Sequence, residues 1–251
     1  MDFSGKIVFV TGSSTGIGRA TAKMFAEHGA DVIVHCNESV DAANQLVNEI
    51  EQLGKRTLLV RGDVSDKLQV QQMVNEIRSE FGRVDILVNN AGSLVKRARF
   101  EELDEELWTR VIDVNLKSVY LVSQAVLPMM KAQGGGRIIN LTSIAARHGG
   151  GLGSLVYATS KGGVATLTRG MAKDLAEYNI LVNAVAPGII STPFHDRFSP
   201  PEMRSAWAKQ IPLHREGTPE ETAGSILFLA SSLADYITGQ IIDVNGGQWF
   251  S

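Results

Sequence analysis

The 251-residue chain is predicted to fold as a single α/β domain built on a doubly wound, mostly parallel sheet. Two observations predict this class. Short apolar and β-branched runs alternate with longer helical patterns from one end of the chain to the other. No linker, internal repeat or shift in composition divides residues 1–251 into separate parts. With 44% hydrophobic residues, a chain of this length can bury one sizeable core.

Seven apolar runs rich in valine and isoleucine predict the strands of the sheet. The patterns between the first four predict helices over 18–29, 41–54 and 67–82, and Gly29 ends the first of these. Because strands and helices alternate, right-handed crossovers would place helices on both faces of about seven mostly parallel strands. The predicted strands span 6–12, 31–36, 56–64, 84–92, 136–143, 180–188 and 239–247.

One segment near the C-terminus breaks this alternation. Six of the seven prolines lie between Pro187 and Pro219, where regular periodicity is weak. Long loops inside a compact domain usually have a function, so we expect a substrate lid at about 188–215, with a short helix at 201–210. A solvated excursion without a role is the alternative.

Composition excludes several classes of protein. The net charge is −3 and there is no long basic run, so no nucleic-acid surface is expected. No run of 18 apolar residues predicts a membrane span, and the N-terminus lacks the layout of a signal peptide. Cys36 is the only cysteine, which excludes an internal disulfide and a two-cysteine metal clip. We therefore expect a cytoplasmic or similarly reducing location and no metal.

A glycine-rich turn follows the first predicted strand. The stretch TGSSTGIG, residues 11–18, places Gly12, Gly16 and Gly18 where a strand turns into a helix. Glycine lets the backbone approach a ligand closely, and the free N–H groups of the following helix suit a pyrophosphate. Asp63, at the end of the third strand, could accept a hydrogen bond from an adenine amino group or could cap the next helix. The NNAG stretch, 89–92, ends the fourth strand near the expected reversal of strand order.

Tyr157 and Lys161 lie four residues apart on a predicted helix. An ammonium beside a phenol favours the phenolate, so Lys161 is expected to lower the Tyr157 pKa from about 10. A tyrosine of this kind can exchange a proton with an alcohol. Ser143, at a strand end, could polarise a carbonyl oxygen, and Asn115 is an amide within an otherwise apolar helical pattern. The neighbouring glycines 162 and 163 would leave room for a ligand or another backbone.

These motifs, with APG at 186–188 and ITGQIIDVNGG at 237–247, resemble the classical short-chain dehydrogenase/reductase family over essentially the whole chain. The resemblance implies a Rossmann-type fold and metal-free hydride transfer between a nicotinamide cofactor and a carbonyl or secondary alcohol. It implies that Tyr157 is the general acid/base and that Lys161 lowers its pKa and holds the nicotinamide ribose. Ser143 would orient the carbonyl, and Asn115 would keep a water in a proton relay.

The resemblance also implies which residues contact the cofactor, and the end of the second strand bears on its identity. The position that is usually acidic in NAD-binding proteins falls on Cys36, and Asn37 and Ser39 could donate to a 2′-phosphate, whereas Glu38 would oppose one. These residues favour NADP(H) over NAD(H). The implied contacts are Gly12, Ser14, Thr15, Gly16, Ile17, Gly18, Asn37, Asp63, Val64, Asn89, Ala91, Gly92, Tyr157, Lys161, Pro187, Gly188, Ile190 and Thr192.

Basic residues near the expected pocket predict an anionic carbonyl substrate, such as a keto-sugar acid. Each could instead be an ordinary surface charge. A carrier-bound 3-oxoacyl chain and a neutral sugar or polyol remain alternatives, as does a dinucleotide-binding redox sensor without turnover. The basic residues are Lys96, Arg97, Arg99, Arg147 and His148, with His195 and Arg197 from the lid.

A homotetramer is expected from the resemblance. The helix that holds Met129 and Met130 could supply a contact surface, and so could the C-terminal residues Trp249 and Phe250. The two aromatic residues could instead fold back onto their own subunit.

Overall fold

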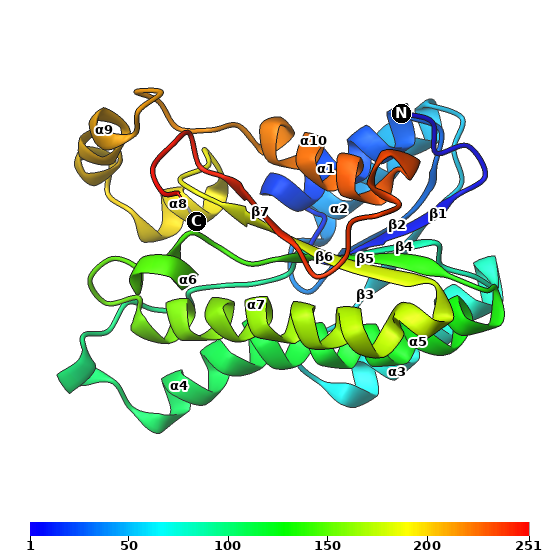
Figure 1. The fold of residues 1–251 in the computed structure, drawn as a ribbon, viewed down its shortest axis with the longest axis horizontal. Helices are drawn as coiled ribbons and strands as arrows, with labels where there is room; N and C mark the ends of the chain where they lie inside the picture. The colour runs from blue at the N-terminus through cyan, green and yellow to red at the C-terminus, as the bar shows by residue number, and fades with distance from the viewer. Residues whose placement is uncertain (251) are drawn as a thin grey trace.

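A computed structural model describes residues 1–250 of the chain. Seven strands form one sheet in the order β3-β2-β1-β4-β5-β6-β7, and every neighbouring pair is parallel. This confirms the predicted α/β class (Figure 1). The strands are β1 (Ile7–Val10), β2 (Asp31–Cys36), β3 (Thr57–Arg61), β4 (Ile86–Asn89), β5 (Gly136–Leu141), β6 (Ile180–Pro187) and β7 (Ile241–Val244).

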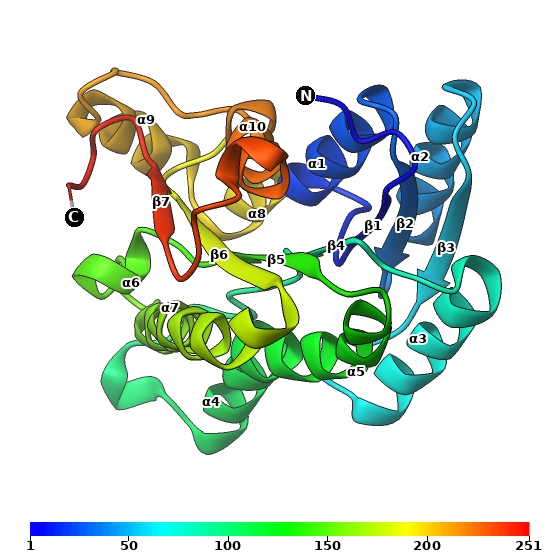
Figure 2. The same ribbon diagram turned by 45° about the vertical axis from the view of Figure 1, so that its right-hand side comes forward.

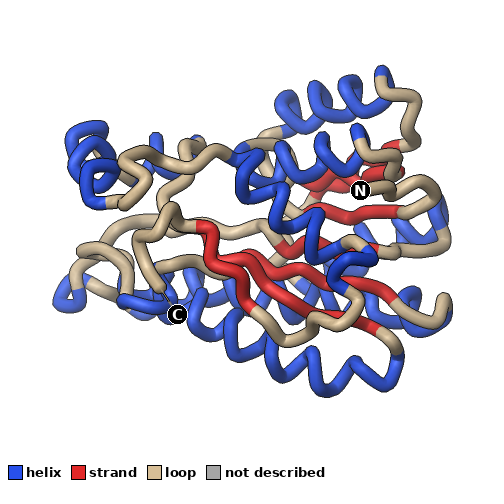
Figure 3. Tube along the Cα trace, turned by 45° about the horizontal axis from the view of Figure 1, so that its top comes forward, coloured by secondary structure: helices blue, strands red, loops and turns tan. Residues whose placement is uncertain are grey.

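Helices cover both faces of the sheet. Figure 2 shows α1, α2 and α10 on one face and α3, α5 and α7 on the other, and Figure 3 shows the strands between these two layers. The helices are α1 (Gly16–Glu27), α2 (Val40–Gln52), α3 (Lys67–Phe81), α4 (Glu105–Ile112), α5 (Ser118–Ala132), α6 (Ala145–His148), α7 (Leu155–Leu175), α8 (Pro193–Phe198), α9 (Pro201–Gln210) and α10 (Pro219–Ala230). Shorter turns are η1 (Phe100–Glu102), the π-helical η2 (Asp113–Lys117), η3 (Ala176–Tyr178) and η4 (Ser232–Ala234).

Each face of the sheet buries its own apolar cluster. Phe25 of α1 and Ile226 of α10 belong to the cluster on one face, and Ile77 of α3 and Val126 of α5 belong to the cluster on the other. Met129 and Met130 are also buried in this second cluster. These two methionines therefore face the sheet, because the apolar face of α5 turns toward it, and the subunit contact expected on this helix stays a prediction.

The strand order reverses between β1 and β4, where α1 and α5 leave for opposite faces. In an open α/β sheet, ligands bind beyond the carboxyl ends of the strands at such a point. The predicted strand ends at Gly92 and Ser143 extend past β4 and β5, because these residues have left the sheet for loops at that edge. The sheet therefore positions both segments beside one another.

The proline-rich segment lies at the same end of the molecule, where Figure 1 shows α8 and α9. The predicted helix at 201–210 is confirmed as α9. Arg204 of α9 donates to Glu216 at 2.7 Å and also pairs with Asp196 of α8, so the two short helices and the chain that follows them are joined by one ion-pair cluster.

Two further features concern the part of the chain that the structure describes. None of its helices combines the length and the apolar character needed to cross a bilayer. Within residues 1–250 no group of three or more His, Cys, Asp or Glu side chains is arranged to hold a metal ion.

Candidate active site

Each glycine of the first turn is required at its position for a steric reason. Gly12 and Gly16 adopt φ values of +62° and +57°, which side chains rarely allow. A Cβ on Gly12 would lie 3.0 Å from the Ala91 Cα, and a Cβ on Gly18 would overlap the Asn90 amide and the Gly12 carbonyl. The turn thus packs closely on the loop after β4, and the α1 N-terminus presents free N–H groups beside it.

The two asparagines of the NNAG stretch have different environments. Asn90 donates to the carbonyls of Thr11 and Gly12, at 2.9 and 3.0 Å, and lines the cavity. Asn89 is buried and donates to Ser123 and Asn140, both at 2.9 Å, so its side chain lies away from the cavity. Sequence reasoning missed Asn90, because it predicted the strand to run on to Gly92, whereas β4 ends at Asn89.

At the end of β3, Asp63 lines the cavity with one carboxylate oxygen 2.9 Å from Arg110. Burial alone would raise its pKa, but hydrogen bonds from Ser65 and Arg110 leave the pKa of Asp63 below its usual value. The alternative that Asp63 caps the next helix is wrong, because Asp66 accepts from the N–H groups of Leu68 and Gln69 at the start of α3.

A single cavity of about 680 Å³ runs from the end of β2 to the aromatic side chains of α8 and α9. Gly18, Asn89 and Asn115 lie outside its lining, with Gly18 packed against Asn90 of the lining and Asn115 packed against Gly92. The other predicted site residues line the cavity: Gly12, Ser14, Thr15, Gly16, Ile17, Asn37, Asp63, Val64, Ala91, Gly92, Ser143, Tyr157, Lys161, Pro187, Gly188, Ile190 and Thr192.

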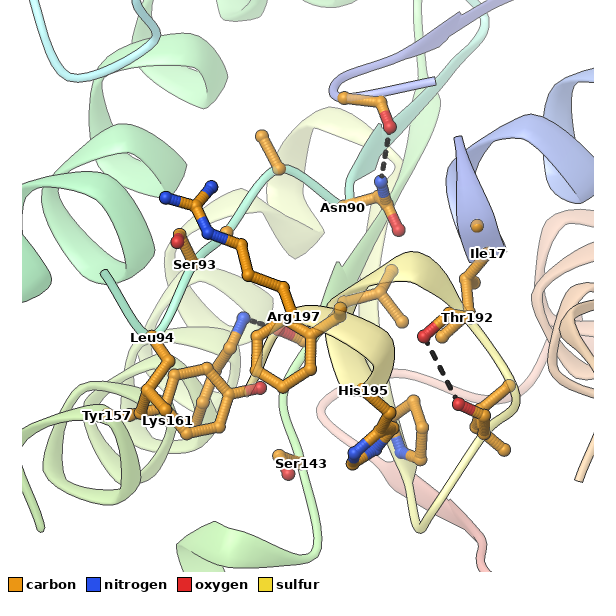
Figure 4. A pocket seen from close by; sticks show the side chains of 18 of the residues that line it. Ile17, Asn90, Ser93, Leu94, Ser143, Tyr157, Lys161, Thr192, His195 and Arg197 are labelled. Atoms are coloured by element: carbon orange, nitrogen blue, oxygen red, sulfur yellow. Dashed lines mark hydrogen bonds between the residues drawn. The ribbon is translucent and has the colours of Figure 1, made fainter. Parts of the chain in front are cut away.

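Tyr157 and Lys161 lie on one face of α7 and point into this cavity, with Ser143 opposite them beyond β5 (Figure 4). The Lys161 ammonium donates to the Leu141 carbonyl at 2.8 Å and lies 5.7 Å from the centre of the Tyr157 ring. Burial raises the pKa of Tyr157 to about 12, with hydrogen bonding from Ser143 acting in the opposite sense. Burial lowers the pKa of Lys161 to about 8. The expected lowering of the phenol pKa is therefore wrong, because burial outweighs the hydrogen bond from Ser143.

Asn115 lies in η2, a π-helical turn between α4 and α5, and its side chain is fully buried. Its amide donates to the carbonyls of Ser93 and Val111, at 2.6 and 2.9 Å, and accepts from the Ser93 N–H at 3.1 Å. A Cβ on Gly92 would lie 2.7 Å from the Asn115 oxygen and 3.3 Å from the Lys161 nitrogen. The π-turn thus places the amide beside the lysine, behind the cavity wall.

The two glycines after Lys161 differ in their surroundings. A Cβ on Gly163 would lie 2.7 Å from the Leu116 side chain of η2. A Cβ on Gly162 would meet nothing within 4 Å. Gly163 therefore makes room for the π-turn, whereas no neighbour within the described chain requires a glycine at 162.

The basic residues expected at the rim are only partly brought together. Arg97, His148, His195 and Arg197 line the cavity, whereas Lys96, Arg99 and Arg147 do not. Arg147 instead lies 3.7 Å from Asp243. Burial lowers the pKa of His195 to about 4, so this ring is neutral near pH 7. Figure 4 shows Arg197 reaching from α8 across the cavity.

The end of the cavity at α8 and α9 is largely aromatic. Phe194 lies 5.7 Å from the Tyr157 ring, and His195 lies 6.3 Å from Trp207, as measured between ring centres. Phe194 also stacks edge-on against Phe198 at 5.1 Å. Sequence reasoning missed this wall, because nothing in the proline-rich segment indicates which side chains face inward.

The opposite end of the cavity fits the adenosine half of a dinucleotide. The residue at the end of β2 is Cys36, a buried thiol, so no carboxylate stands at that position. Burial raises the pKa of this thiol. Asn37, Glu38 and Ser39 line the cavity beside it. Arg19 pairs with Glu49 at 2.7 Å and is not part of the lining. The positive-φ glycine turn between the two ends provides a cradle that a side chain would fill.

Comparison with known proteins gives a consistent result. A family model described as enoyl-(acyl carrier protein) reductase matches residues 12–248. The chain is 42% identical to 3-oxoacyl-(acyl-carrier-protein) reductase of Thermotoga maritima over 247 residues, which covers 98% of this chain and 99% of the relative. It is 39% identical to cis-4-hydroxycyclohexanecarboxylate dehydrogenase of Sinomonas cyclohexanicum, with 98% and 97% covered.

Solved structures of similar proteins contain dinucleotides. A 7α-hydroxysteroid dehydrogenase complexed with NADH and 7-oxo glycochenodeoxycholic acid superposes with a TM-score of 0.93 at 37% identity, covering 98% of this chain and 95% of that one. A gluconate 5-dehydrogenase from Burkholderia cenocepacia in complex with NADP and tartrate gives a TM-score of 0.92 at 33% identity, with 98% and 96% covered.

Proposed function

This chain belongs to the short-chain dehydrogenase/reductase family, and from that premise we propose that it reduces a ketone to a secondary alcohol with NADP(H). One observation carries the proposal. Tyr157, Lys161 and Ser143 converge on a cavity that is continuous with the glycine-rich turn at Gly12. A proton donor and a dinucleotide cradle therefore meet in one space, as hydride transfer requires.

Tyr157 acts as the general acid. With a pKa of about 12 its phenol keeps its proton near neutral pH, so it can donate that proton to the oxygen that becomes the alcohol. The reduced nicotinamide supplies the hydride to the carbonyl carbon when it is bound. Ser143 hydrogen-bonds the same carbonyl oxygen and stabilises the charge that develops on it.

Lys161 and Asn115 support the proton donor from behind. The Lys161 ammonium, fixed by the Leu141 carbonyl, favours the phenolate that remains after proton donation and holds the ribose hydroxyls of the cofactor. Asn115 fixes the backbone of Ser93 and the π-turn beside that lysine, and keeps a water in the path that returns a proton to Tyr157.

NADP(H) is the preferred cofactor. An acidic residue at the end of β2 would repel a 2′-phosphate, and the buried Cys36 stands there instead. The Asn37 amide and the Ser39 hydroxyl can donate to such a phosphate from the cavity wall. The gluconate 5-dehydrogenase bound to NADP supports this assignment by its similarity.

A 3-oxoacyl thioester is the first substrate class. Phe194, beside Tyr157, and Trp207 line the cavity with aromatic surface that suits the apolar part of an acyl chain, and Phe198 packs against Phe194. The 42% identity to a 3-oxoacyl-(acyl-carrier-protein) reductase supports the same class. The proline-rich segment at about 188–215, which carries this wall, acts as the lid over the substrate.

A ketone that carries a carboxylate, such as a keto-sugar acid, is the second candidate. Arg97 and Arg197 line the cavity. Within residues 1–250, Arg97 donates to two backbone carbonyls and Arg197 lies over the Phe198 ring, and neither forms an ion pair with an acidic group. A guanidinium in such a position can bind a carboxylate through paired hydrogen bonds. The gluconate and cyclohexanecarboxylate dehydrogenases among the relatives favour this alternative.

The enzyme assembles as a homotetramer. Large apolar side chains are exposed on two separate parts of the chain, Trp108 and Tyr120 on α4 and α5, and Leu233 and Tyr236 beside η4. Two distinct self-complementary patches are what a closed tetramer with two-fold axes needs. Light scattering on the purified protein measures the mass directly, and a monomeric mass would contradict this assembly.

The activity is tested by following NADPH and NADH oxidation by absorbance with a 3-oxoacyl thioester, a 2-keto-3-deoxy sugar acid and a neutral aldose. Fastest turnover of the thioester with NADPH would support the first substrate class, and fastest turnover of the sugar acid would support the second. Cofactor binding without turnover of any carbonyl would contradict the reductase and favour a dinucleotide-binding sensor.

A further inference from the structure

His35 is a buried residue of β2 whose side chain connects two loops of the cofactor cavity. It is 2% exposed and lines the cavity floor. The Gly12 N–H donates to the His35 Nδ1 atom at 2.8 Å, and the His35 Nε2 atom lies 3.0 Å from the Gly62 carbonyl. The Ser13 N–H also donates to the His35 carbonyl at 2.9 Å. The glycine-rich turn is thus held to β2 through this residue.

These partners fix the protonation state of the ring. A backbone N–H can only donate, so Nδ1 must offer a lone pair to Gly12. A carbonyl oxygen can only accept, so Nε2 must carry the hydrogen toward Gly62. His35 is therefore a neutral imidazole with its proton on Nε2. A second proton on Nδ1 would face the Gly12 N–H, and two donors would then oppose one another in a buried space.

We propose that His35 is a positioning residue that holds Gly12 in the shape needed to bind the dinucleotide, and that protonation of its ring in acid weakens NADP(H) binding. This inference rests on the proposed function, because the glycine turn matters only if it cradles a dinucleotide. Gly12 has a φ of +62°, and a Cβ on it would lie only 3.0 Å from the Ala91 Cα. A small shift of the turn would therefore change the shape of the cradle.

The groups around the His35 ring determine the pH at which it takes up a proton. Asp63, one residue beyond Gly62, is the charged group that acts on His35, and its own carboxylate is paired with Arg110 at 2.9 Å. From β1 the ring meets Phe9, with ring centres 6.4 Å apart, and from the turn the Ser13 hydroxyl accepts from the His35 backbone N–H at 2.9 Å. Burial lowers the pKa of His35, and the Gly62 carbonyl and Asp63 oppose this less strongly. The loss of affinity should therefore begin below the ordinary histidine range near pH 6.5.

The test measures the affinity of the full-length protein for NADP⁺ by calorimetry between pH 8 and pH 5. Between pH 8 and pH 5 we expect the wild-type affinity to fall about threefold to tenfold more than that of His35→Asn. This factor corresponds to the free energy of one backbone hydrogen bond. Titration of the cofactor phosphate is common to both proteins, so the difference belongs to His35. His28→Gln, a change at the end of α1, is the matched control and should follow the wild type.

Equal pH dependence in wild type and His35→Asn would overturn the inference while leaving the proposed function intact. A wild-type protein that binds neither NADP⁺ nor NAD⁺ at pH 8 would overturn both. If His35→Asn does not fold, ¹⁵N spectra of the wild-type ring decide instead. A protonated Nε2 and a bare Nδ1, with an Nδ1 titration that coincides with the loss of NADP⁺ affinity, are expected. The opposite tautomer, or a ring already doubly protonated at pH 7, would contradict the proposal.

Discussion

Lys161 holds its ammonium 5.7 Å from the centre of the Tyr157 ring and donates to the Leu141 carbonyl rather than to the phenol. The two groups therefore share one helix face without bonding to each other. Burial raises the pKa of the phenol to about 12 and lowers that of the ammonium to about 8. Each change opposes the charged form of its group, which suits a proton donor held ready for a ketone oxygen.

The buried ammonium predicts a stability that depends on pH. The folded pKa of Lys161, about 8, lies below its unfolded value near 10.5, so the unfolded chain binds more protons between these two values. The free energy of unfolding should therefore rise with pH between about 8 and 10.5 and should be lowest below pH 8, where both states carry the proton. Urea unfolding measures the increase in the free energy of unfolding from pH 7.5 to pH 10. This increase should be larger by about 1–3 kcal/mol in wild type than in Lys161→Met. Lys173→Met, at an exposed position of the same helix, should keep the wild-type gain.

Removal of the Tyr157 hydroxyl should abolish proton donation but spare the cradle. For Tyr157→Phe we expect kcat for ketone reduction to fall by about 10²–10⁴-fold, the usual contribution of a positioned acid. The dinucleotide affinity should change little, because the glycine turn is untouched. Tyr178→Phe, which lies outside the cavity lining and keeps its ring beneath Lys131, should retain full activity. Full reductase activity in Tyr157→Phe would show that another group supplies the proton.

The glycine turn allows a comparison between two alanine substitutions within helices. A Cβ on Gly18 would overlap the Asn90 amide and the Gly12 carbonyl, whereas a Cβ on Gly170 would meet nothing within 4 Å. Gly18→Ala should cost about 1–3 kcal/mol of stability through overpacking and should weaken dinucleotide binding. Gly170→Ala should be neutral or stabilising by about 0.5–1 kcal/mol. Thermal unfolding and cofactor titration measure both effects, and a Gly18→Ala protein indistinguishable from wild type would contradict the packing.

The elements that the sequence predicted are those fixed by local periodicity. The seven strands and α9 follow from apolar runs and helical patterns of their own residues. The direction of single side chains was harder to predict. Asn89 and Asn90 are adjacent, yet one points into the sheet and the other onto the glycine turn, because the strand ends between them. Arg147 was expected at the pocket and instead lies near Asp243 of β7, a partner nearly a hundred residues away that no local pattern reveals.

Arg97 joins α8, part of the proposed lid, to the chain before α7, and its removal should loosen that connection. Its guanidinium donates to the Phe198 carbonyl at the end of α8 and to the Leu152 carbonyl before α7, each at 2.8 Å. For Arg97→Ala we expect KM for the carbonyl substrate to rise about tenfold, since charged hydrogen bonds are worth about 1.5–3 kcal/mol each. The affinity for the dinucleotide should stay the same, and limited proteolysis should cut 193–210 faster. Arg99→Ala, at an exposed position outside the cavity lining, is the control. An unchanged KM together with unchanged proteolysis would mean that α8 is held by its own packing, with Arg97 adding nothing.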